Sequence, residues 1–252
     1  MKVKKINYFG KKTIKKFVIQ LNFTKDFELF DILKIADFTN SIVEEFPDVP
    51  KILLMPKPGE TINLGPLIYK DTPKGNNSFE IGRNFVKFNF SRYERWVIEI
   101  ERIKKVLTKL NNFLILPTVK DINMTYIDEF QLKIEDFDFG KYFTFPIDPE
   151  KKWKYFYDDF FLGFVPYQEY KGEEKIKLVF RLRSIAQTEI DYIYSLETAY
   201  LTRNSMIEVD DSLYSIHLER AHDFIITYFI DFLTPNYQRE LQLDFTEVEL
   251  DY

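Results

Sequence analysis

The stretch of sequence that most constrains the fold spans residues 79–110, where the spacing of apolar side chains changes from two residues to three or four. Residues 86–90 alternate between apolar and polar types, as expected of a strand with one buried face. After Ser91 the apolar residues recur at helical spacing, with charged residues between them, which predicts a helix with one face packed on a core. The residues of this apolar stripe are Trp96, Ile100, Ile103, Leu107 and Leu110.

A capping box is predicted at the start of this helix, which we expect to span residues 91–110. The Ser91 hydroxyl can accept a hydrogen bond from the backbone N–H of Glu94, and the Glu94 side chain can reach back to the N–H of Ser91. Trp96, at the head of the apolar stripe, is expected to be buried. We therefore assign structural roles to Ser91, Tyr93, Glu94 and Trp96, and also to Tyr126 in a predicted strand region over residues 119–134.

Cysteine is absent from the 252 residues, which excludes a disulfide framework, a thiolate metal site and a cysteine nucleophile. The basic N-terminal segment is not followed by the apolar run and small-residue cleavage site of a signal peptide. No stretch approaches the ~18 apolar residues that a membrane span requires. We therefore expect a cytoplasmic protein without a membrane-spanning segment.

The net charge of −5 is distributed unevenly along the chain. Residues 189–252 contain 14 acidic residues and three arginines, a net charge of −11, which leaves +6 for residues 1–188. Residues 2–16 alone contain seven lysines and no acid. Either the two ends attract each other, or the basic end is a surface for an acidic partner such as nucleic acid. We expect residues 2–16 to form a mobile or surface-bound lead to a first strand at residues 17–23.

The second half of the chain is predicted to be an antiparallel meander followed by a long helix. Residues 175–183 and 189–200 alternate between apolar and polar types, and residues 151–170 contain nine aromatic side chains, as in strands with one buried face. The helix is expected over residues 211–233. Its C-terminal part, from Asp223 to Leu233, is apolar nearly all round, so it must lie deep in the core or in a homo-oligomer interface.

The predicted fold class is α+β, with antiparallel sheets and long packed helices. Residues 1–134 and 135–252 each contain strands and then one long helix, so the chain is expected to consist of two similar strand-strand-helix halves within one continuous globular unit. The alternative is a single sheet that packs against both long helices.

Four segments, in order along nearly the whole chain, carry a resemblance to a known family. The sequence resembles the uncharacterised prokaryotic family described as sporadically distributed, whose members have about this length. Thr125 and Asp128 stand where this family usually has arginine and asparagine. The resemblance implies a shared scaffold and the patchy distribution of accessory or defence genes, and it implies no established activity. The matching segments are Phe46-Pro47 and residues 80–96, 123–130 and 218–241.

The sequence contains no pattern typical of a catalytic or metal site. The two histidines, His217 and His222, are five residues apart, which rotates them by ~140° on a helix and places them on different faces. Neither a nucleophile elbow nor a glycine-rich phosphate loop is present. Asp158, Asp159, Glu173 and Lys175 are compatible with a metal-dependent nuclease, but we prefer to interpret them as charges at a hairpin tip. We therefore predict no catalytic residue, no cofactor and no metal.

One aromatic and basic run is the candidate partner-binding site. Its side chains can stack on single-stranded nucleic acid, pack inside an aromatic strand pair, or contact another protein, because aromatic residues dominate interface energetics. The expected function is a non-enzymatic protein-binding scaffold, for example an accessory or antitoxin-like component of a defence system. Single-stranded nucleic-acid binding is the first alternative, and a metal-dependent nuclease is the second. The run consists of Lys151, Lys152, Trp153, Lys154, Tyr155 and Tyr157.

Overall fold

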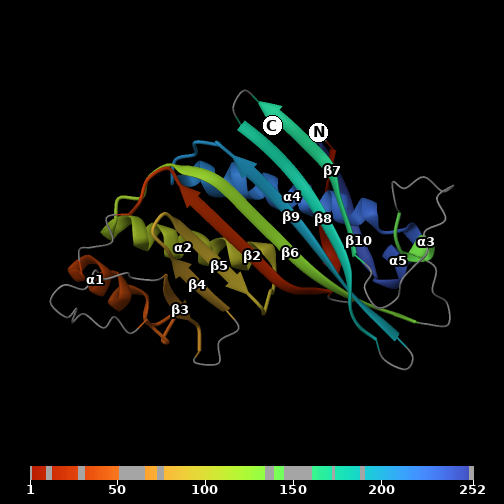
Figure 1. The fold of residues 1–252 in the computed structure, drawn as a ribbon, viewed down its shortest axis with the longest axis horizontal. Coiled ribbons are helices and arrows are strands. Elements are labelled where there is room, and N and C mark those ends of the chain that lie inside the picture. Colours follow the sequence, from red (N-terminus) through yellow and green to blue (C-terminus); the bar gives the residue numbers. More distant parts are fainter. Residues whose placement is uncertain are drawn as a thin grey trace. The chain divides into compact units, whose positions relative to one another are not determined.

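The computed structural model describes residues 2–9, 13–27, 32–50, 66–72, 77–133, 139–144, 161–171, 174–187 and 191–249. These residues form antiparallel strands and helices (Figure 1), which confirms the α+β class. The chain divides into two compact units. Unit 1 contains residues 1–15, 124–201 and 216–252, and unit 2 contains residues 16–123 and 202–215. Segments of the two units alternate along the sequence, so the units do not coincide with residues 1–134 and 135–252.

The described part of unit 2 contains a run of antiparallel strands in the order β3-β4-β5-β2 and the helices α1 and α2. In β2 and β5 every second side chain is buried, as the alternation in the sequence predicts. Phe88 is opposite Phe79 on one side and Ile19 on the other. The elements are β2 (Ile14–Phe23), α1 (Ile32–Ile42), β3 (Leu67–Lys70), β4 (Asn77–Ile81), β5 (Phe85–Phe90) and α2 (Trp96–Phe113).

Aromatic rings hold the helices of unit 2 against these strands. Phe38 of α1 lies edge-on to Tyr69 and Phe79, at centroid distances of 5.7 and 6.1 Å. Trp96 of α2 meets Phe17 of β2 at 5.9 Å and is buried, so the prediction of a buried Trp96 is confirmed. Such edge-to-face contacts add stability beyond the burial of area alone.

The capping box at Ser91 and Glu94 is wrong, because α2 begins at Trp96 and its N-cap residue is Arg95, which makes no side-chain cap. Ser91 lies in the exposed connection before the helix. The carboxylate of Glu99, in the first turn of α2, takes the place of the expected cap. It accepts a hydrogen bond from the Glu94 N–H at 3.2 Å and forms an ion pair with Arg102 at 3.1 Å. Glu99 is fully buried, and burial raises the pKa of its carboxyl.

Unit 1 contains the strand order β6-β9-β8-β7, a separate pair formed by β1 and β10, and the helices α3, α4 and α5. The predicted strands at residues 175–183 and 189–200 correspond to β8 and β9, except that residues 188–190 lie outside the described part. The strands are β1 (Lys2–Phe9), β6 (Val119–Lys133), β7 (Phe161–Lys171), β8 (Glu174–Gln187), β9 (Asp191–Arg203) and β10 (Leu243–Glu249). The helices are α3 (Phe139–Tyr142), α4 (Glu219–Phe232) and α5 (Pro235–Glu240), and a π-helical turn (Leu213–Leu218) precedes α4.

The apolar helix α4 is a core helix of unit 1. Its sheet side packs against Phe130 of β6 through Phe229, at a ring distance of 6.2 Å, and against Phe180 of β8 through Phe232, at 5.3 Å. On another side the backbone N–H of Lys4 in β1 donates to the Thr227 hydroxyl at 2.8 Å. The helix therefore needs apolar residues on more than one face, which explains its sequence.

The basic N-terminal segment is a strand and not a mobile lead. β1 pairs antiparallel with β10, and the register places Lys2 opposite Glu249 and Lys4 opposite Glu247. Opposite charges across a strand pair stabilise it. Lys4 and Lys5 form ion pairs with Asp231 and Asp223, so these two lysines of the basic end contact acidic residues of the C-terminal part. Strand β10 was not predicted.

Along the chain, the described helices and strands occur twice in the same order. The first reads β2-α1-β3-β4-β5-α2 and the second reads β6-α3-β7-β8-β9-α4. The order of neighbouring strands is also the same, β3-β4-β5-β2 in one and β7-β8-β9-β6 in the other. The second copy of this repeat begins at β6, within the predicted first half, so the repeat does not follow the predicted division into residues 1–134 and 135–252, and it is longer than strand-strand-helix.

Candidate functional site

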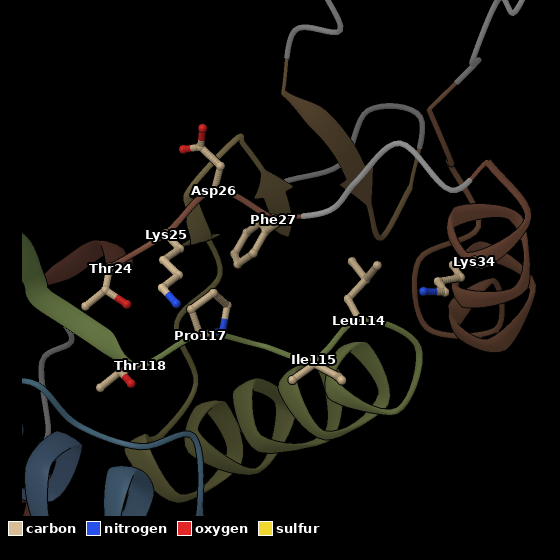
Figure 2. Close-up of a pocket in the computed structure, with 9 residues that line it drawn as sticks. All are labelled: Thr24, Lys25, Asp26, Phe27, Lys34, Leu114, Ile115, Pro117 and Thr118. Carbon is tan, nitrogen blue, oxygen red and sulfur yellow. The ribbon is translucent and has the colours of Figure 1, made fainter.

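A hollow of about 360 Å³ opens in unit 2 between two connecting segments (Figure 2). One wall is the segment that follows β2, and the other is the connection from α2 to β6. We call this region the hollow. Its lining residues are Thr24, Lys25, Asp26, Phe27, Lys34, Leu114, Ile115, Pro117 and Thr118.

Backbone hydrogen bonds fix the two walls of the hollow. The N–H of Thr24 donates to the carbonyl of Thr118 at 3.0 Å, which joins one wall to the other. The N–H of Phe27 donates to the carbonyl of Arg83 at 2.7 Å. In the second wall, the Asn111 side chain accepts from the N–H of Leu116 at 2.9 Å. Because both walls are bonded to the rest of unit 2, the hollow is preformed.

In the connection from α2 to β6, which forms the second wall of the hollow, one exposed apolar residue lies between two buried ones. Leu114 and Leu116 are 5% and 8% exposed, whereas Ile115 between them is 96% exposed. Phe27 is buried and packs edge-on against Phe23 at 4.8 Å. The branched side chain of Ile115 is thus exposed to solvent at the edge of the hollow, beside the buried apolar residues Leu114 and Phe27.

The charged part of the hollow is basic. Lys25 and Lys34 come from different sides, and their ammonium groups point toward the same space (Figure 2). The carboxylate of Asp26 points away from this space and pairs with Arg83 at 2.6 Å. Among the lining residues that the structure describes, none is a histidine and the one acid is engaged elsewhere, so the arrangement suits recognition of an anion rather than proton transfer.

A second group of ionisable residues lies inside unit 1. The Tyr126 hydroxyl is 3.0 Å from Nδ1 of His222 on α4. Burial lowers the pKa of His222 to about 3, and the nearby positive charge of Lys5 acts in the same direction. Lys5 in turn pairs with the buried carboxylate of Asp223 at 3.6 Å. The imidazole is therefore neutral at physiological pH and connects β6 with α4.

Asp128 is two residues beyond Tyr126 on the buried face of β6 and is 2% exposed. Its Oδ1 accepts a hydrogen bond from the Thr13 hydroxyl at 2.6 Å. Burial raises the pKa of Asp128 to about 7, against the opposing effect of that hydrogen bond. Because Tyr126 and Asp128 are enclosed, this group serves the internal structure of unit 1.

The predicted partner-binding run, Lys151, Lys152, Trp153, Lys154, Tyr155 and Tyr157, lies outside the described residues, and so do Asp158, Asp159 and Glu173. Lys175 is described, and its ammonium lies 4.9 Å from the centroid of the Tyr170 ring. Within the described ranges, no group of three or more histidine, aspartate or glutamate residues is placed to hold a metal ion.

Of the residues assigned structural roles, Trp96 and Tyr126 are buried, and Tyr93 is half-buried and edge-on to Phe17 at 5.7 Å. Lys25 and Ile115 belong to no motif that marks them as functional in the sequence. Residues 113–116 are all apolar, so the pattern itself does not distinguish the exposed Ile115 from its buried neighbours.

No protein-family model matches the chain, and the comparison with curated proteins finds no match either. The resemblance to the sporadically distributed family therefore stays a prediction. In the part of the chain that the structure describes, every helix is too short or too polar to cross a membrane.

Proposed function

We propose that this chain is a non-catalytic scaffold that binds another protein through the hollow of unit 2. The single observation that carries the proposal is the nearly complete exposure of Ile115 between the buried Leu114 and Leu116. Exposing an apolar side chain contributes nothing to folding, whereas its burial by a partner is favourable at about 25 cal/mol per Å².

The surroundings of Ile115 support a protein as the partner. Interface energy is concentrated in a few side chains that enter pockets, with polar groups around them. Ile115 stands at the edge of a preformed hollow whose wall includes the buried Leu114 and whose polar groups include Lys25. A rigid site of this kind binds without the cost of ordering a loop.

Single-stranded nucleic acid remains the second candidate, because Lys25 and Lys34 lie at the same site. Nucleic-acid sites combine several basic residues along a groove with exposed aromatic rings for base stacking. Phe27, the aromatic residue among those lining residues that the structure describes, is 4% exposed, so little of its ring is free to stack. The site therefore favours a protein partner.

Photo-crosslinking from the hollow tests this proposal. A benzophenone amino acid replaces Ile115 in the native cells, and the same group at Val97, which is 70% exposed on α2, is the control. We expect protein adducts of defined mass from position 115 and none from position 97. Equal labelling from both positions would contradict the proposal, and adducts that nuclease removes would favour the second candidate.

A charge substitution gives an independent measurement. Ile115→Glu should abolish co-purification of the crosslinked partner, whereas Val97→Glu should leave it unchanged, because a desolvated carboxylate is costly in an interface. Both variants should unfold at the wild-type denaturant concentration, since exposed substitutions change stability by only about 0.5 kcal/mol. Retention of the partner by Ile115→Glu would exclude the hollow as its site.

The proposal includes a cytoplasmic location and an accessory or defence setting, such as neutralisation of a toxin. The location is supported by the cysteine-free composition, which suits a reducing compartment, and the setting is supported by the family resemblance. The identity of the partner crosslinked from position 115 tests the setting directly.

A further inference from the structure

We propose that the hollow of unit 2 receives the C-terminal residue of the partner, with its terminal carboxylate beside the Lys25 ammonium and its apolar side chain against Leu114 and Ile115. This inference rests on the proposed function and specifies which part of the partner is recognised. Charge, size and chain geometry each favour a chain end.

The charge of the hollow selects an anion. Lys25 is exposed, and Figure 2 shows its ammonium pointing into the hollow from the wall that follows β2. Lys34 points toward the same space from α1. The carboxylate of Asp26 is turned away toward Arg83. A carboxylate that accepts a hydrogen bond from an ammonium forms a stronger contact than a neutral pair does.

The size of the hollow limits how much chain it can hold. Its volume of about 360 Å³ corresponds to a sphere of roughly 9 Å in diameter, which spans two to three residues of extended chain. It also lies at the small end of the roughly 300–1,000 Å³ typical of ligand pockets. A chain end fits this space, whereas a strand or helix that continues in both directions needs a longer groove.

The apolar wall distinguishes a terminal residue from an internal acidic one. Leu114 and Pro117 line the same hollow as Lys25, so the ligand must present a carboxylate and an apolar group together. Successive side chains of an extended segment point to opposite faces, so an internal aspartate and its apolar neighbour cannot both enter. A terminal residue carries its carboxylate and its side chain on one Cα, and recognition of terminal carboxylates is an established mode of peptide binding.

Short peptides test this inference on the full-length protein. The probes are acetyl-Gly-Ser-X with X as leucine, valine or phenylalanine, each prepared as the free acid and as the carboxamide. A separate control peptide, acetyl-Gly-Asp-Leu-Gly-amide, carries its carboxylate on an internal residue. Binding is followed by NMR through the methyl signals of Ile115 and Leu114. We expect at least one free acid to bind roughly tenfold more tightly than its amide and than the internal-aspartate probe.

Lysine variants test whether the terminal carboxylate of the peptide binds to Lys25. Lys25→Gln should weaken binding of the free acid by roughly tenfold and leave the amide unchanged. Lys120→Gln, which removes an exposed lysine of unit 2 outside the hollow, is the matched control and should change neither. Equal loss in both lysine variants would indicate general electrostatic attraction and would overturn the inference.

The remaining outcomes separate this inference from the proposed function. If acid and amide bind equally, or if the internal-aspartate probe binds best, the terminal-carboxylate inference is wrong while protein binding at the hollow stands. If no probe shifts the methyl signals although position 115 crosslinks to a protein, the inference again fails alone. If neither peptides nor proteins engage position 115, both proposals fail.

Discussion

The hydroxyl of Thr13 donates a hydrogen bond to Oδ1 of Asp128 across 2.6 Å, and both side chains are buried. Thr13 lies just before β2, and its carbonyl also accepts from the backbone N–H of Glu129 at 2.9 Å. The two contacts join Thr13 to the middle of β6 within unit 1. Because the Thr13 hydroxyl is the partner that the structure gives to a buried carboxyl group, the protonation of Asp128 is coupled to the stability of unit 1.

The contribution of Asp128 to stability should fall as the pH rises from about 4 to about 7. Burial raises the pKa of Asp128 to about 7 from an ordinary value of 3.8, so in this window the folded protein retains a proton that the unfolded chain has released. Raising the pH therefore favours unfolding. Asp128→Asn stays neutral, and it should be more stable than the wild type by up to about 4 kcal/mol at pH 8, with little difference at pH 4.

Urea unfolding of both proteins between pH 4 and pH 8 measures this effect, since the difference between them isolates Asp128. Glu129→Gln is the control, because Glu129 is half-buried and pairs with Lys15 at 3.7 Å; its difference from the wild type should not follow the same window. A difference for Asp128→Asn that is constant with pH would contradict the raised pKa.

Burial of Trp96, rather than a cap at Ser91, should stabilise the start of α2. Trp96 is 8% exposed and meets the ring of Phe17, so Trp96→Ala should cost about 3–5 kcal/mol. Ser91→Ala should cost less than about 0.5 kcal/mol, because Ser91 is exposed and lies before the helix. Chemical unfolding of the two variants checks both values. A cost near 1 kcal/mol for Ser91→Ala would restore the capping box.

The sequence predicted those helices and strands that are determined by residues close together along the chain. Residues 86–90 and the stripe from Trp96 to Leu110 have periodicities that depend only on which face is buried. The predicted capping box is wrong because Ser91 and Glu94 match a local motif that does not determine where α2 begins. The start of α2 is determined by the contact of Trp96 with the ring of Phe17 and by Glu99, which accepts a hydrogen bond from the N–H of Glu94. Contacts of this kind are not encoded in a motif of four residues.

Long-range pairing explains the other differences. The sequence showed that one end of the chain is basic and the other acidic, but it did not predict that residues 2–9 and 243–249 pair as strands, with Lys2 opposite Glu249. The hollow was not predictable for the same reason, because Lys25 and Ile115 are separated by many residues and meet only after folding. The candidate run at residues 151–157 was chosen on composition, and it lies outside the described residues.

Gly82 should tolerate no side chain while Phe85 is present. A Cβ at position 82 would lie 2.0 Å from the ring of Phe85, and the tight turn between β4 and β5 is fixed by the N–H of Gly82, which donates to the carbonyl of Phe85 at 2.9 Å. Gly82→Ala should therefore cost about 1–3 kcal/mol through overpacking. In a Phe85→Ala background the same substitution should cost clearly less, which a double-mutant cycle measures as coupling. Equal costs in both backgrounds would show that the ring moves aside freely.

His222 should remain neutral well below the pH at which a histidine usually gains a proton. Burial and the charge of Lys5 lower its pKa to about 3, and Nδ1 lies 3.0 Å from the Tyr126 hydroxyl. Between pH 6.5 and that value the unfolded chain binds a proton that the folded protein does not, so stability should be lost as the pH falls through this window. The side chain is half-buried, which limits the size of the loss.

Proton NMR measures the titration of His222 directly, because the chain contains only two histidines and a His217→Gln variant assigns the remaining ring signal. That signal should keep its neutral chemical shift from pH 7.5 to pH 5. Tyr126→Phe removes the hydrogen bond to Nδ1 and should cost about 1–2 kcal/mol at pH 7. In His222→Gln the acid-dependent loss of stability between pH 6.5 and pH 4 should become smaller than in the wild type. A His222 signal that titrates with a midpoint near 6.5 would show that water reaches the ring, and the contact with Tyr126 would then have no role in excluding the charge.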